Sequence, residues 1–260
     1  MVLRAEHVYL GYGKKSVVED FNLNVSKGEI VSIIGPNGSG KTTILKSLAR
    51  YLKPQQGKVY LEDQDIFQLN TRYVARRIAV LPQVKSAAGD LKVKDLIEYG
   101  RYPHLKFGRR MNEEDHRIVD WALERTGLSE LRHRPLATLS GGERQRAWIA
   151  MALAQKPEIM LLDEPTAFLD ISYQLEVLEL VKELNETLGL TIVMVLHDLN
   201  HAARYSHRIV AVKDGEVRSA GEPQKVLTGD LLKTIFRIEA DMLEDKTNAC
   251  PHIIPQRVVG

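Results

Sequence analysis

Residues 35–42 read Gly-Pro-Asn-Gly-Ser-Gly-Lys-Thr and fit the pattern G-x-x-x-x-G-K-[ST]. The apolar, β-branched run before them (29–35) predicts a buried strand, and the run KTTILKSLARYL after them (41–52) predicts a helix. At the usual frequency of glycine, a chance match in a chain of this length has a probability of about 1%. This loop between a strand and a helix therefore constrains the fold more than any other feature of the sequence.

The residue types of this loop suit the binding of an anion. Glycines let the backbone curl until several N–H groups point at one phosphate, and the following helix adds its positive N-terminal end. Lys41 can reach the β- and γ-phosphates, the Thr42 hydroxyl can ligate Mg²⁺, and Thr43 can contribute further. We therefore expect nucleotide phosphates to bind at Gly35, Pro36, Asn37, Gly38, Ser39, Gly40, Lys41, Thr42 and Thr43.

Other short apolar runs also have the form of buried strands. They are RIAVLPQ (77–83), EIMLLDEP (158–165) and LTIVMVLHD (190–198). Between the last two, residues 173–189 have apolar side chains at helical spacing and stop at Gly189. Buried strands joined by helices predict an α/β core with a mostly parallel sheet.

Two segments depart from this alternation. Residues 1–27 and 56–62 predict an antiparallel β addition, and residues 86–156 contain no convincing strand and predict a helical insertion. We therefore expect an α/β P-loop NTPase core with a mostly parallel sheet, an N-terminal antiparallel β subdomain and an inserted α-helical subdomain. In this single domain we expect the following parts: the core in 1–85 and 157–240, the helical subdomain in 86–156, and a C-terminal tail in 241–260, where the pattern predicts no element.

Polar side chains end three of the predicted strands. Asp163 and Glu164 follow one apolar run, and ligands of parallel α/β sheets bind at the carboxyl ends of the strands. We expect Asp163 to hold the Mg²⁺ shell and Glu164 to orient the attacking water, because that acid must differ from the one on the metal. Gln83 and His197 end two other runs and can touch the metal, the water or the γ-phosphate there, although position alone favours a structural role for each.

The segment His197-Asp-Leu-Asn-His201 looks like the H-E-x-x-H helix of a zinc protease. Position 198 is Asp rather than Glu, and the first histidine ends a strand instead of lying within a helix. We therefore expect no catalytic zinc site at these two histidines.

The composition argues against several other classes of protein. With 36 Lys and Arg against 34 Asp and Glu, the formal net charge of +2 is too small to indicate a nucleic-acid partner. The single cysteine, Cys250, cannot form an internal disulfide or a cysteine zinc site. The apolar runs fall far short of the ~20 residues that span a bilayer, and the N-terminus lacks the apolar stretch of a signal peptide. We expect a soluble cytosolic protein; if it serves a membrane, it does so through partners.

One further motif identifies a family. Leu139-Ser-Gly-Gly-Glu143 precedes a helical run, as a second anion-binding helix N-terminus would. Together with the P-loop and the Asp163-Glu164 pair, it makes the chain resemble the ATP-binding subunit of an ABC transporter. The resemblance covers nearly the whole chain and includes Tyr12, Gln83 as the Q-loop glutamine, the D-loop Ala167-Phe-Leu-Asp170 and His197 as the switch histidine.

The resemblance implies a head-to-tail homodimer that binds ATP with Mg²⁺ between the P-loop of one chain and the signature of the other. It implies that Tyr12 stacks on adenine and that the signature residues act on the nucleotide of the partner chain. Gln83 would sense Mg²⁺, Glu164 would be the general base, and His197 would hold the γ-phosphate. The signature is Ser140, Gly141, Gly142 and Glu143, and the D-loop contributes Asp170.

Further sequence details resemble the ATPases of iron-siderophore, heme and cobalamin importers, with the ferric-siderophore branch the most similar. The segments that carry this likeness include Glu98-Tyr-Gly-Arg-Tyr-Pro-His104 and Leu169-Asp-Ile-Ser-Tyr-Gln174. Ser172-Tyr173 and Phe168 depart from the usual residues of that branch. The implied partners are two membrane permease subunits and, indirectly, an extracytoplasmic solute-binding protein, with the chain at the cytoplasmic face of the membrane.

Two other classes stay open. One is a non-transport ABC module that acts on nucleic acid or ribosomes, but the chain lacks the second ATPase domain or long coiled coil of such proteins. The basic and aromatic stretch 101–110 is compatible with nucleic-acid binding, although a solvated loop of the helical subdomain is favoured. The other is the ATPase of an exporter, which shares every catalytic motif. We expect no nucleic-acid partner.

Overall fold

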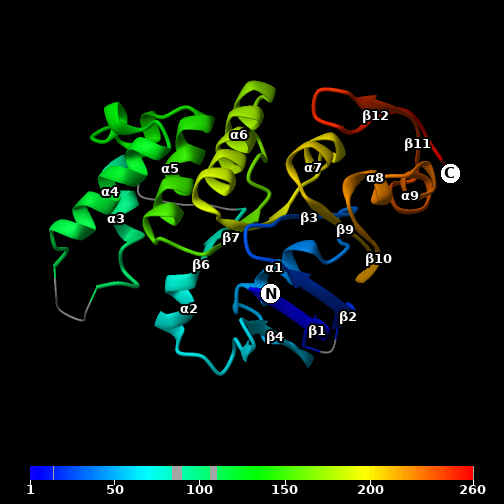
Figure 1. Cartoon of the computed structure of the whole chain (residues 1–260), viewed down its shortest axis with the longest axis horizontal. Helices are drawn as coiled ribbons and strands as arrows, with labels where there is room; N and C mark the ends of the chain where they lie inside the picture. Colours follow the sequence, from blue (N-terminus) through cyan, green and yellow to red (C-terminus); the bar gives the residue numbers. More distant parts are fainter. Residues whose placement is uncertain (14, 84–89, 106–109, 260) are drawn as a thin grey trace. The chain divides into compact units, whose positions relative to one another are not determined.

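The computed structural model describes residues 1–13, 15–83, 90–105 and 110–259 (Figure 1). The chain divides into two compact units, and each is described by itself. Unit 1 contains Met1–Gln68 and Thr191–Gly260, and unit 2 contains Leu69–Leu190.

Unit 1 contains an antiparallel sheet near the N-terminus. Its strands, in the order β2-β1-β4-β5 across the sheet, are β1 (Leu3–Tyr12), β2 (Lys15–Val25), β4 (Gln56–Leu61) and β5 (Gln64–Asp65). Buried apolar residues alternate with exposed polar ones along β2, as a sheet with one solvated face requires. The antiparallel addition predicted for 1–27 and 56–62 is confirmed.

Unit 1 also contains the strands that lead to the glycine-rich loop and to His197. Strand β3 (Ile30–Ile34) lies between β8 (Thr191–Val195) and β9 (Arg208–Lys213) and is parallel to both. Every residue of β3 and of β8 is buried, as parallel strands covered on both faces require. Strand β10 (Glu216–Gly221) pairs antiparallel with β9.

Helix α1 (Lys41–Leu48) begins directly after the loop, as predicted, but it is shorter than the predicted range 41–52. The backbone of Arg50 is left-handed, with a φ of 64°. The N–H groups of Tyr51 and Leu52 both bond to the Lys46 carbonyl, at 2.7 and 3.1 Å. The helix therefore ends in a closed, left-handed cap.

The last part of unit 1 is helical and then forms a β-hairpin. The elements are α7 (Leu199–Tyr205), α8 (Pro223–Val226), α9 (Gly229–Leu231), the π-helical turn η3 (Leu232–Phe236), β11 (Ile238–Asp245) and β12 (Cys250–Val258). Strands β11 and β12 pair along their whole length, so most of 241–260 belongs to a hairpin rather than to a segment without an element. The pattern did not reveal β12 because it contains Pro251 and Pro255, which disfavour strands in general.

Unit 2 combines a pair of parallel strands with helices. Its strands are β6 (Ile78–Leu81) and β7 (Ile159–Asp163), and its helices are α2 (Thr71–Arg77), α3 (Val93–Tyr99), α4 (Glu113–Arg125), the short 3-10 turns η1 (Ser129–Leu131) and η2 (Leu136–Thr138), α5 (Gly141–Ala154) and α6 (Ile171–Leu188). The described residues between 90 and 156 form helices and turns without a named strand. Residues 84–89 of the expected helical segment and its boundary, and 106–109 of the basic and aromatic stretch, lie outside the described residues.

The helical part of unit 2 has its own apolar core. Helices α3, α4 and α5 bury Val, Leu, Ile and Ala side chains against one another. Where α3 ends, the backbone runs very close to α5: a Cβ on Gly100 would lie 2.1 Å from the Met151 carbonyl oxygen. Glycine is therefore required at this position for the two helices to pack.

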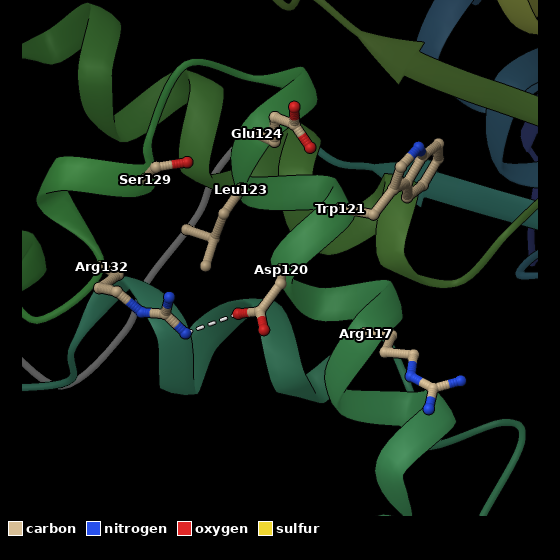
Figure 2. A pocket seen from close by; sticks show the side chains of 7 residues that line it. All are labelled: Arg117, Asp120, Trp121, Leu123, Glu124, Ser129 and Arg132. Atoms are coloured by element: carbon tan, nitrogen blue, oxygen red, sulfur yellow. Dashed lines mark hydrogen bonds and ion pairs between the residues drawn. The ribbon is translucent and has the colours of Figure 1, made fainter.

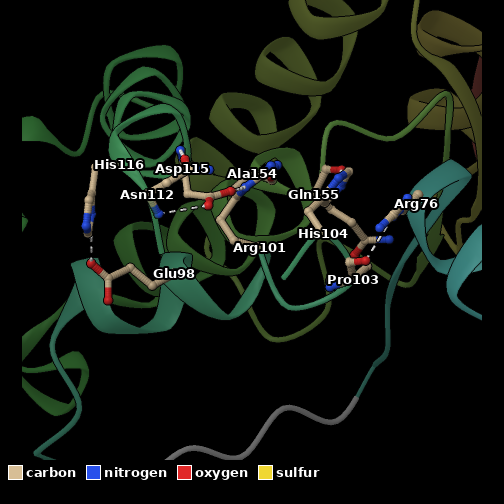
Figure 3. A network of polar contacts seen from close by, with 10 residues as sticks. All are labelled: Arg76, Glu98, Arg101, Pro103, His104, Asn112, Asp115, His116, Ala154 and Gln155. Carbon is tan, nitrogen blue, oxygen red and sulfur yellow. Dashed lines mark hydrogen bonds and ion pairs between the residues drawn. The ribbon is translucent and has the colours of Figure 1, made fainter. Parts of the chain in front are cut away.

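A buried ion pair fastens the ends of these three helices (Figure 3). Arg101, after α3, and Asp115, in the first turn of α4, are only 5% and 6% exposed, and Arg101 Nε lies 3.0 Å from Asp115 Oδ1. Arg101 Nη1 also donates to the carbonyl of Ala154 at the end of α5, at 2.7 Å. Asp115 accepts the N–H of Asn112 and completes a capping box there. Burial acts to raise the pKa of Asp115, but these donors outweigh it and hold the pKa below its ordinary value.

A second set of hydrogen bonds joins the residues that follow α3 and α5 to α2 and to the start of β6 (Figure 3). His104 Nε2 lies 2.8 Å from the Gln155 carbonyl oxygen, and burial lowers the pKa of this histidine. Gln155 Nε2 donates to the carbonyls of Ala75 and Ile78. Arg76 Nε donates to the Pro103 carbonyl at 2.9 Å. Pro103 and His104, which follow α3, are thus tied to the start of the strand that leads to Gln83.

Replacing the buried carboxylate is expected to destabilise the helical part strongly. Asp115→Ala leaves the Arg101 guanidinium buried without its ionic partner, which costs about 3–5 kcal/mol of unfolding free energy. Urea unfolding followed by circular dichroism measures the loss. The matched control is Asp120→Ala, which removes the exposed partner of Arg132 and is expected to cost less than about 1 kcal/mol. Equal losses in the two variants would contradict the role of the buried pair.

Candidate nucleotide-binding site

The glycine-rich loop of unit 1 has a backbone that only glycine accommodates at several points. Gly35, Gly38 and Gly40 have φ angles of 152°, 80° and 99°. A Cβ on Gly35 would lie 2.0 Å from the Val212 carbonyl oxygen, and one on Gly40 would lie 2.7 Å from Val18 Cγ2. The curl of the loop is therefore fixed by the close approach of β9 and β2 as well as by its own backbone conformation.

The lysine of the motif is enclosed by this curl. Lys41 is 5% exposed, and its Nζ donates to the carbonyls of Gly35 and Pro36, at 2.9 Å each. The Ser39 hydroxyl is buried and has no hydrogen-bond partner within the part of the chain that the structure describes. A buried hydroxyl in a cradle of glycines, beside an ammonium group, fits a bound phosphate.

The other loop residues complete this cradle. Asn37 and Gly38 are exposed at its tip, Thr42 is half-buried and Thr43 is buried. The hydroxyl of Thr42 is an oxygen ligand of the kind that Mg²⁺ prefers. Tyr12 ends β1 with half of its surface exposed, so its ring has a face available for stacking.

His197 lies at the same edge of the unit 1 sheet as this loop. Strand β3 ends in the loop and β8 ends just before His197; the two strands are parallel, with Ile33 opposite Val195. Leu196 N–H bonds to the Ile33 carbonyl at 3.3 Å, so the pairing continues to the residue before the histidine. Asp198 then caps α7 by accepting the N–H of His201, at 2.9 Å. His197 precedes the helix that contains His201, so the two histidines do not share a helical face.

Two carboxylates, Asp163 and Glu164, lie at the carboxyl end of β7 in unit 2. Asp163 ends β7 and is buried, and Glu164 follows with a left-handed φ of 50°. In an extended strand adjacent side chains point to opposite faces, but the left-handed residue breaks this alternation. Gln83, beyond the end of the neighbouring β6, donates from Nε2 to Glu164 Oε2 at 2.6 Å. The structure therefore brings Gln83 and Glu164 together.

The signature residues form the N-terminus of α5. Ser140 caps the helix: its Oγ accepts the N–H of Glu143, and the Glu143 carboxylate accepts the N–H of Ser140, at 3.2 and 2.8 Å. The backbone N–H of Ser140 holds the pKa of Glu143 below its ordinary value. Gly141 and Gly142 are the first residues of this 14-residue helix, where backbone N–H groups have no partner within the helix.

The signature glycines rest on the segment that contains the D-loop. A Cβ on Gly142 would lie 2.3 Å from Cδ1 of the Tyr173 ring, and one on Gly141 would lie 3.1 Å from Leu169 Cδ2. Asp170 occupies the cap position of α6, and Phe168 is 98% exposed, so its larger side chain is accommodated without a change of packing. In the sequence, Tyr173 is notable only as a departure from the usual residues of the ferric-siderophore branch. No local pattern indicates its contact with Gly142.

A separate hollow of about 560 Å³ lies in the helical part of unit 2 (Figure 2). Its side chains come from α4 and the turn that follows, and Arg132 donates to Asp120 within it, at 2.6 Å. Trp121 lines the same hollow, and Lys156 Nζ lies over its ring, 3.2 Å from the ring centroid. The residues that line it include no glycine or lysine, so it lacks the groups that distinguish the phosphate loop.

Comparison with known proteins decides the family. The sequence profile of the family described as ABC transporter matches residues 18–167. The chain belongs to the ABC transporter family. It is an ATPase cassette of that family, and the fold class expected from the sequence is confirmed by solved cassettes. One, a metal-chelate type ABC transporter in an inward-facing conformation, has a TM-score of 0.85 and 28% identity, and the match covers 98% of this chain and 97% of that one.

Another solved neighbour of this ABC cassette is a dimer. It is the ATP-binding cassette MJ0796 with ADP and Pi in a post-hydrolysis state, with a TM-score of 0.72, 32% identity, and coverage of 85% of this chain and 98% of that one.

Within the described ranges, no helix has both the length and the apolar character needed to cross a membrane.

Curated relatives match almost end to end. The iron(3+)-hydroxamate import ATP-binding protein FhuC of Bacillus subtilis (strain 168) is 49% identical, over 95% of this chain and 92% of the relative. The petrobactin import ATP-binding protein FpuC of Bacillus anthracis is 46% identical, over 99% and 94%. The ferric enterobactin transport ATP-binding protein FepC of Escherichia coli (strain K12) is 43% identical, over 97% and 93%.

Removing the enclosed ammonium group is expected to weaken nucleotide binding. Lys41→Ala loses a charged donor to the phosphates and is expected to reduce ATP affinity by about 10- to 100-fold. Equilibrium titration with a fluorescent ATP analogue measures the change. Lys46→Ala is the matched control, because Lys46 is exposed on the same helix. Unchanged affinity in Lys41→Ala would contradict the assignment of the loop.

The contact between Gly142 and Tyr173 predicts a specific pairwise effect. Gly142→Ala drives a methyl group into the Tyr173 ring and is expected to cost about 1–3 kcal/mol of unfolding free energy. Adding Tyr173→Ala removes the clash, so the double variant is expected to be more stable than the sum of the single changes predicts. Urea unfolding of the four proteins measures the coupling. Strict additivity would show that the ring does not set the requirement for glycine.

Proposed function

We propose that this chain is the ATP-hydrolysing subunit of an ABC importer that takes up ferric-siderophore complexes through a membrane permease. The observation that carries the proposal is the enclosed Lys41 in its glycine cradle, in a chain that is similar over nearly its whole length to named iron-siderophore import ATPases. The loop supports the use of ATP, and the relatives support the direction of transport and the cargo.

ATP binds with its adenine on Tyr12 and its phosphates on residues 35–43. We assign Thr42, Gln83 and Asp163 to Mg²⁺, because hydroxyl, amide and carboxylate oxygens are the ligands this ion takes. When bound, the ion neutralises charge on the β- and γ-phosphates. His197, at the same sheet edge as the loop, holds the γ-phosphate by a hydrogen bond from its ring.

Glu164 is the general base. It takes a proton from the attacking water as the water oxygen bonds to the γ-phosphorus and the bond from that phosphorus to the ADP oxygen breaks. The Gln83 amide donates to Glu164 Oε2 at 2.6 Å, so it limits the orientation of the carboxylate. Gln83 therefore links the position of the base to the segment that follows β6.

The working unit is a head-to-tail homodimer. The helix that begins at Ser140, Gly141, Gly142 and Glu143 points its first N–H groups at the γ-phosphate bound by the partner chain, where the positive end of a helix stabilises negative charge. Asp170 of the D-loop faces the partner across the same interface. Two ATP molecules then hold the dimer closed, and hydrolysis removes the γ-phosphate contacts that close it.

The closing dimer drives two permease subunits at the cytoplasmic face of the membrane. An extracytoplasmic solute-binding protein delivers the cargo to the permease. A heme or cobalamin importer is the alternative within the same branch. A cobalamin import ATP-binding protein of Halobacterium salinarum is 37% identical over 92% of this chain, but the match covers only 60% of that relative. The siderophore relatives match more of their own length and with higher identity.

Replacing the general base is expected to separate binding from turnover. Glu164→Gln keeps the size of the side chain but cannot accept the proton, so ATP hydrolysis is expected to fall by at least about 100-fold. The variant is expected to bind ATP and to accumulate as a closed dimer, which sedimentation with ATP and with ADP detects. Hydrolysis near the rate of the unchanged protein would contradict the role of Glu164.

Uptake tests the cargo. Cells that lack this chain are complemented with the unchanged protein or with Glu164→Gln, and uptake of labelled ferric siderophores, heme and cobalamin is measured. We expect the unchanged protein alone to restore uptake, and only of a ferric siderophore. Restoration of heme or cobalamin uptake instead would move the assignment to that cargo, and normal uptake of every cargo without the chain would contradict the importer assignment.

A further inference from the structure

We infer that the C-terminal hairpin, β11 and β12, holds the helix that follows His197 in place, and that Asn200 is the residue through which it positions the histidine. The inference rests on the proposed role of His197 at the γ-phosphate. The family profile ends at residue 167, so both the helix and the hairpin lie beyond the part of the chain that it covers.

Helix α7 begins two residues after His197 and has only seven residues. A helix this short is not stable by itself, so its position depends on what it packs against. Its buried side chains, Ala202, Ala203 and Tyr205, lie in its middle and at its C-terminal end. Just beyond, the Ser206 hydroxyl donates to the Ser32 hydroxyl in β3, at 2.6 Å. These contacts fix the end of α7 that is remote from His197.

The end next to His197 is capped by Asp198 and is also held by the hairpin. Asn200, in the first turn of α7, donates from Nδ2 to the Ile253 carbonyl at 3.1 Å, and its Oδ1 accepts the Ile253 N–H at 2.7 Å. The side-chain amide thus pairs with β12 as a neighbouring strand would. Ile253 is 3% exposed, so both hydrogen bonds lie at a buried point of the hairpin.

The hairpin follows the face of α7 beyond this pair. Arg204 lies four residues after Asn200 and therefore on the same face of the helix. The hydrogen bond from Asn248 is the main cause that lowers the pKa of Asp245, and the charge of Arg204 adds to it; Asp245 and Cys250 flank the turn of the hairpin. Cys250 is buried there, and burial raises the pKa of its thiol, so it packs as an apolar side chain. Figure 1 shows the hairpin beside the helices of this part of unit 1.

A third contact fastens the hairpin to a different helix. Gln224 of α8 donates to the Ala249 carbonyl at 2.6 Å, in the turn between β11 and β12. This bond holds the same hairpin but does not touch α7. It therefore provides a control that separates general attachment of the hairpin from its effect on the helix after His197.

The donors that bind a reacting γ-phosphate must be placed to within a fraction of an ångström of their productive positions. A small shift of the α7 N-terminus therefore lowers the rate of the chemical step more than it lowers ATP affinity. Asn200 touches no reacting atom. It is a positioning residue, and its loss is expected to reduce kcat with little change in KM.

The test compares Asn200→Ala with Gln224→Ala in the full-length chain. Steady-state ATPase measurements give kcat and KM, and thermal unfolding shows that each variant is folded. Asn200→Ala is expected to lower kcat by about fivefold or more, with KM for ATP within about twofold, while Gln224→Ala stays within about twofold in both. Asn200→Asp keeps the oxygen that accepts the Ile253 N–H and is expected to recover part of the rate.

A spectroscopic readout tests the path through His197. Histidine is labelled with ¹³C, and the ring signal of His197 is assigned by its absence in His197→Ala. The signal is expected to move in Asn200→Ala and to stay in place in Gln224→Ala. An unchanged signal and rate in Asn200→Ala, or equal losses in both variants, would overturn the inference and leave the proposed function intact. Full activity of His197→Ala would instead contradict the role of His197 and, with it, the inference.

Discussion

The loop that curls around the Lys41 ammonium group determines the arrangement of the phosphate site in unit 1. The Gly35 and Pro36 carbonyls hold the ammonium from one side, and β9 approaches the Gly35 Cα too closely for any side chain. The loop therefore keeps its shape only if β3 and β9 stay in register, and β8, on the other side of β3, brings His197 to the same edge. Burial of these strands supplies the stability that a rigid phosphate cradle requires.

Much of this arrangement could be predicted from the sequence because the strong signals are local. The runs that end at Ile34, Leu81, Asp163 and Val195 are apolar on both faces, and each forms a buried strand. The pattern gave the start of α1 correctly but not its end, because the left-handed Arg50 that closes the helix is not glycine. The β9–β10 pair was not predicted at all: β10 alternates between exposed and half-buried residues and carries no strong apolar run.

The contacts that tie these elements together could not be predicted, because they join residues that are distant in the sequence. Nothing near Asn200 indicates that its amide pairs with Ile253, and β12 contains two prolines that hide it. Arg101 lies in a stretch whose basic and aromatic residues suggest a solvated loop, yet its guanidinium is buried in an ion pair with Asp115. From the sequence, Gly142 is explained by nucleotide binding alone; its contact with the Tyr173 ring is visible only in the structure.

We propose that the signature of one chain completes the phosphate site of the other, and mixed dimers of two variants test this arrangement. Lys41→Ala disables the loop and Ser140→Arg disables the signature, so each variant alone is expected to hydrolyse ATP very slowly. A mixture of the two contains dimers in which an intact loop meets an intact signature on the other chain. We predict that mixing restores hydrolysis, to about half of the normal rate per mixed dimer. No recovery on mixing, with both variants folded and exchanging subunits, would show that the signature does not act at the phosphate site of the partner chain.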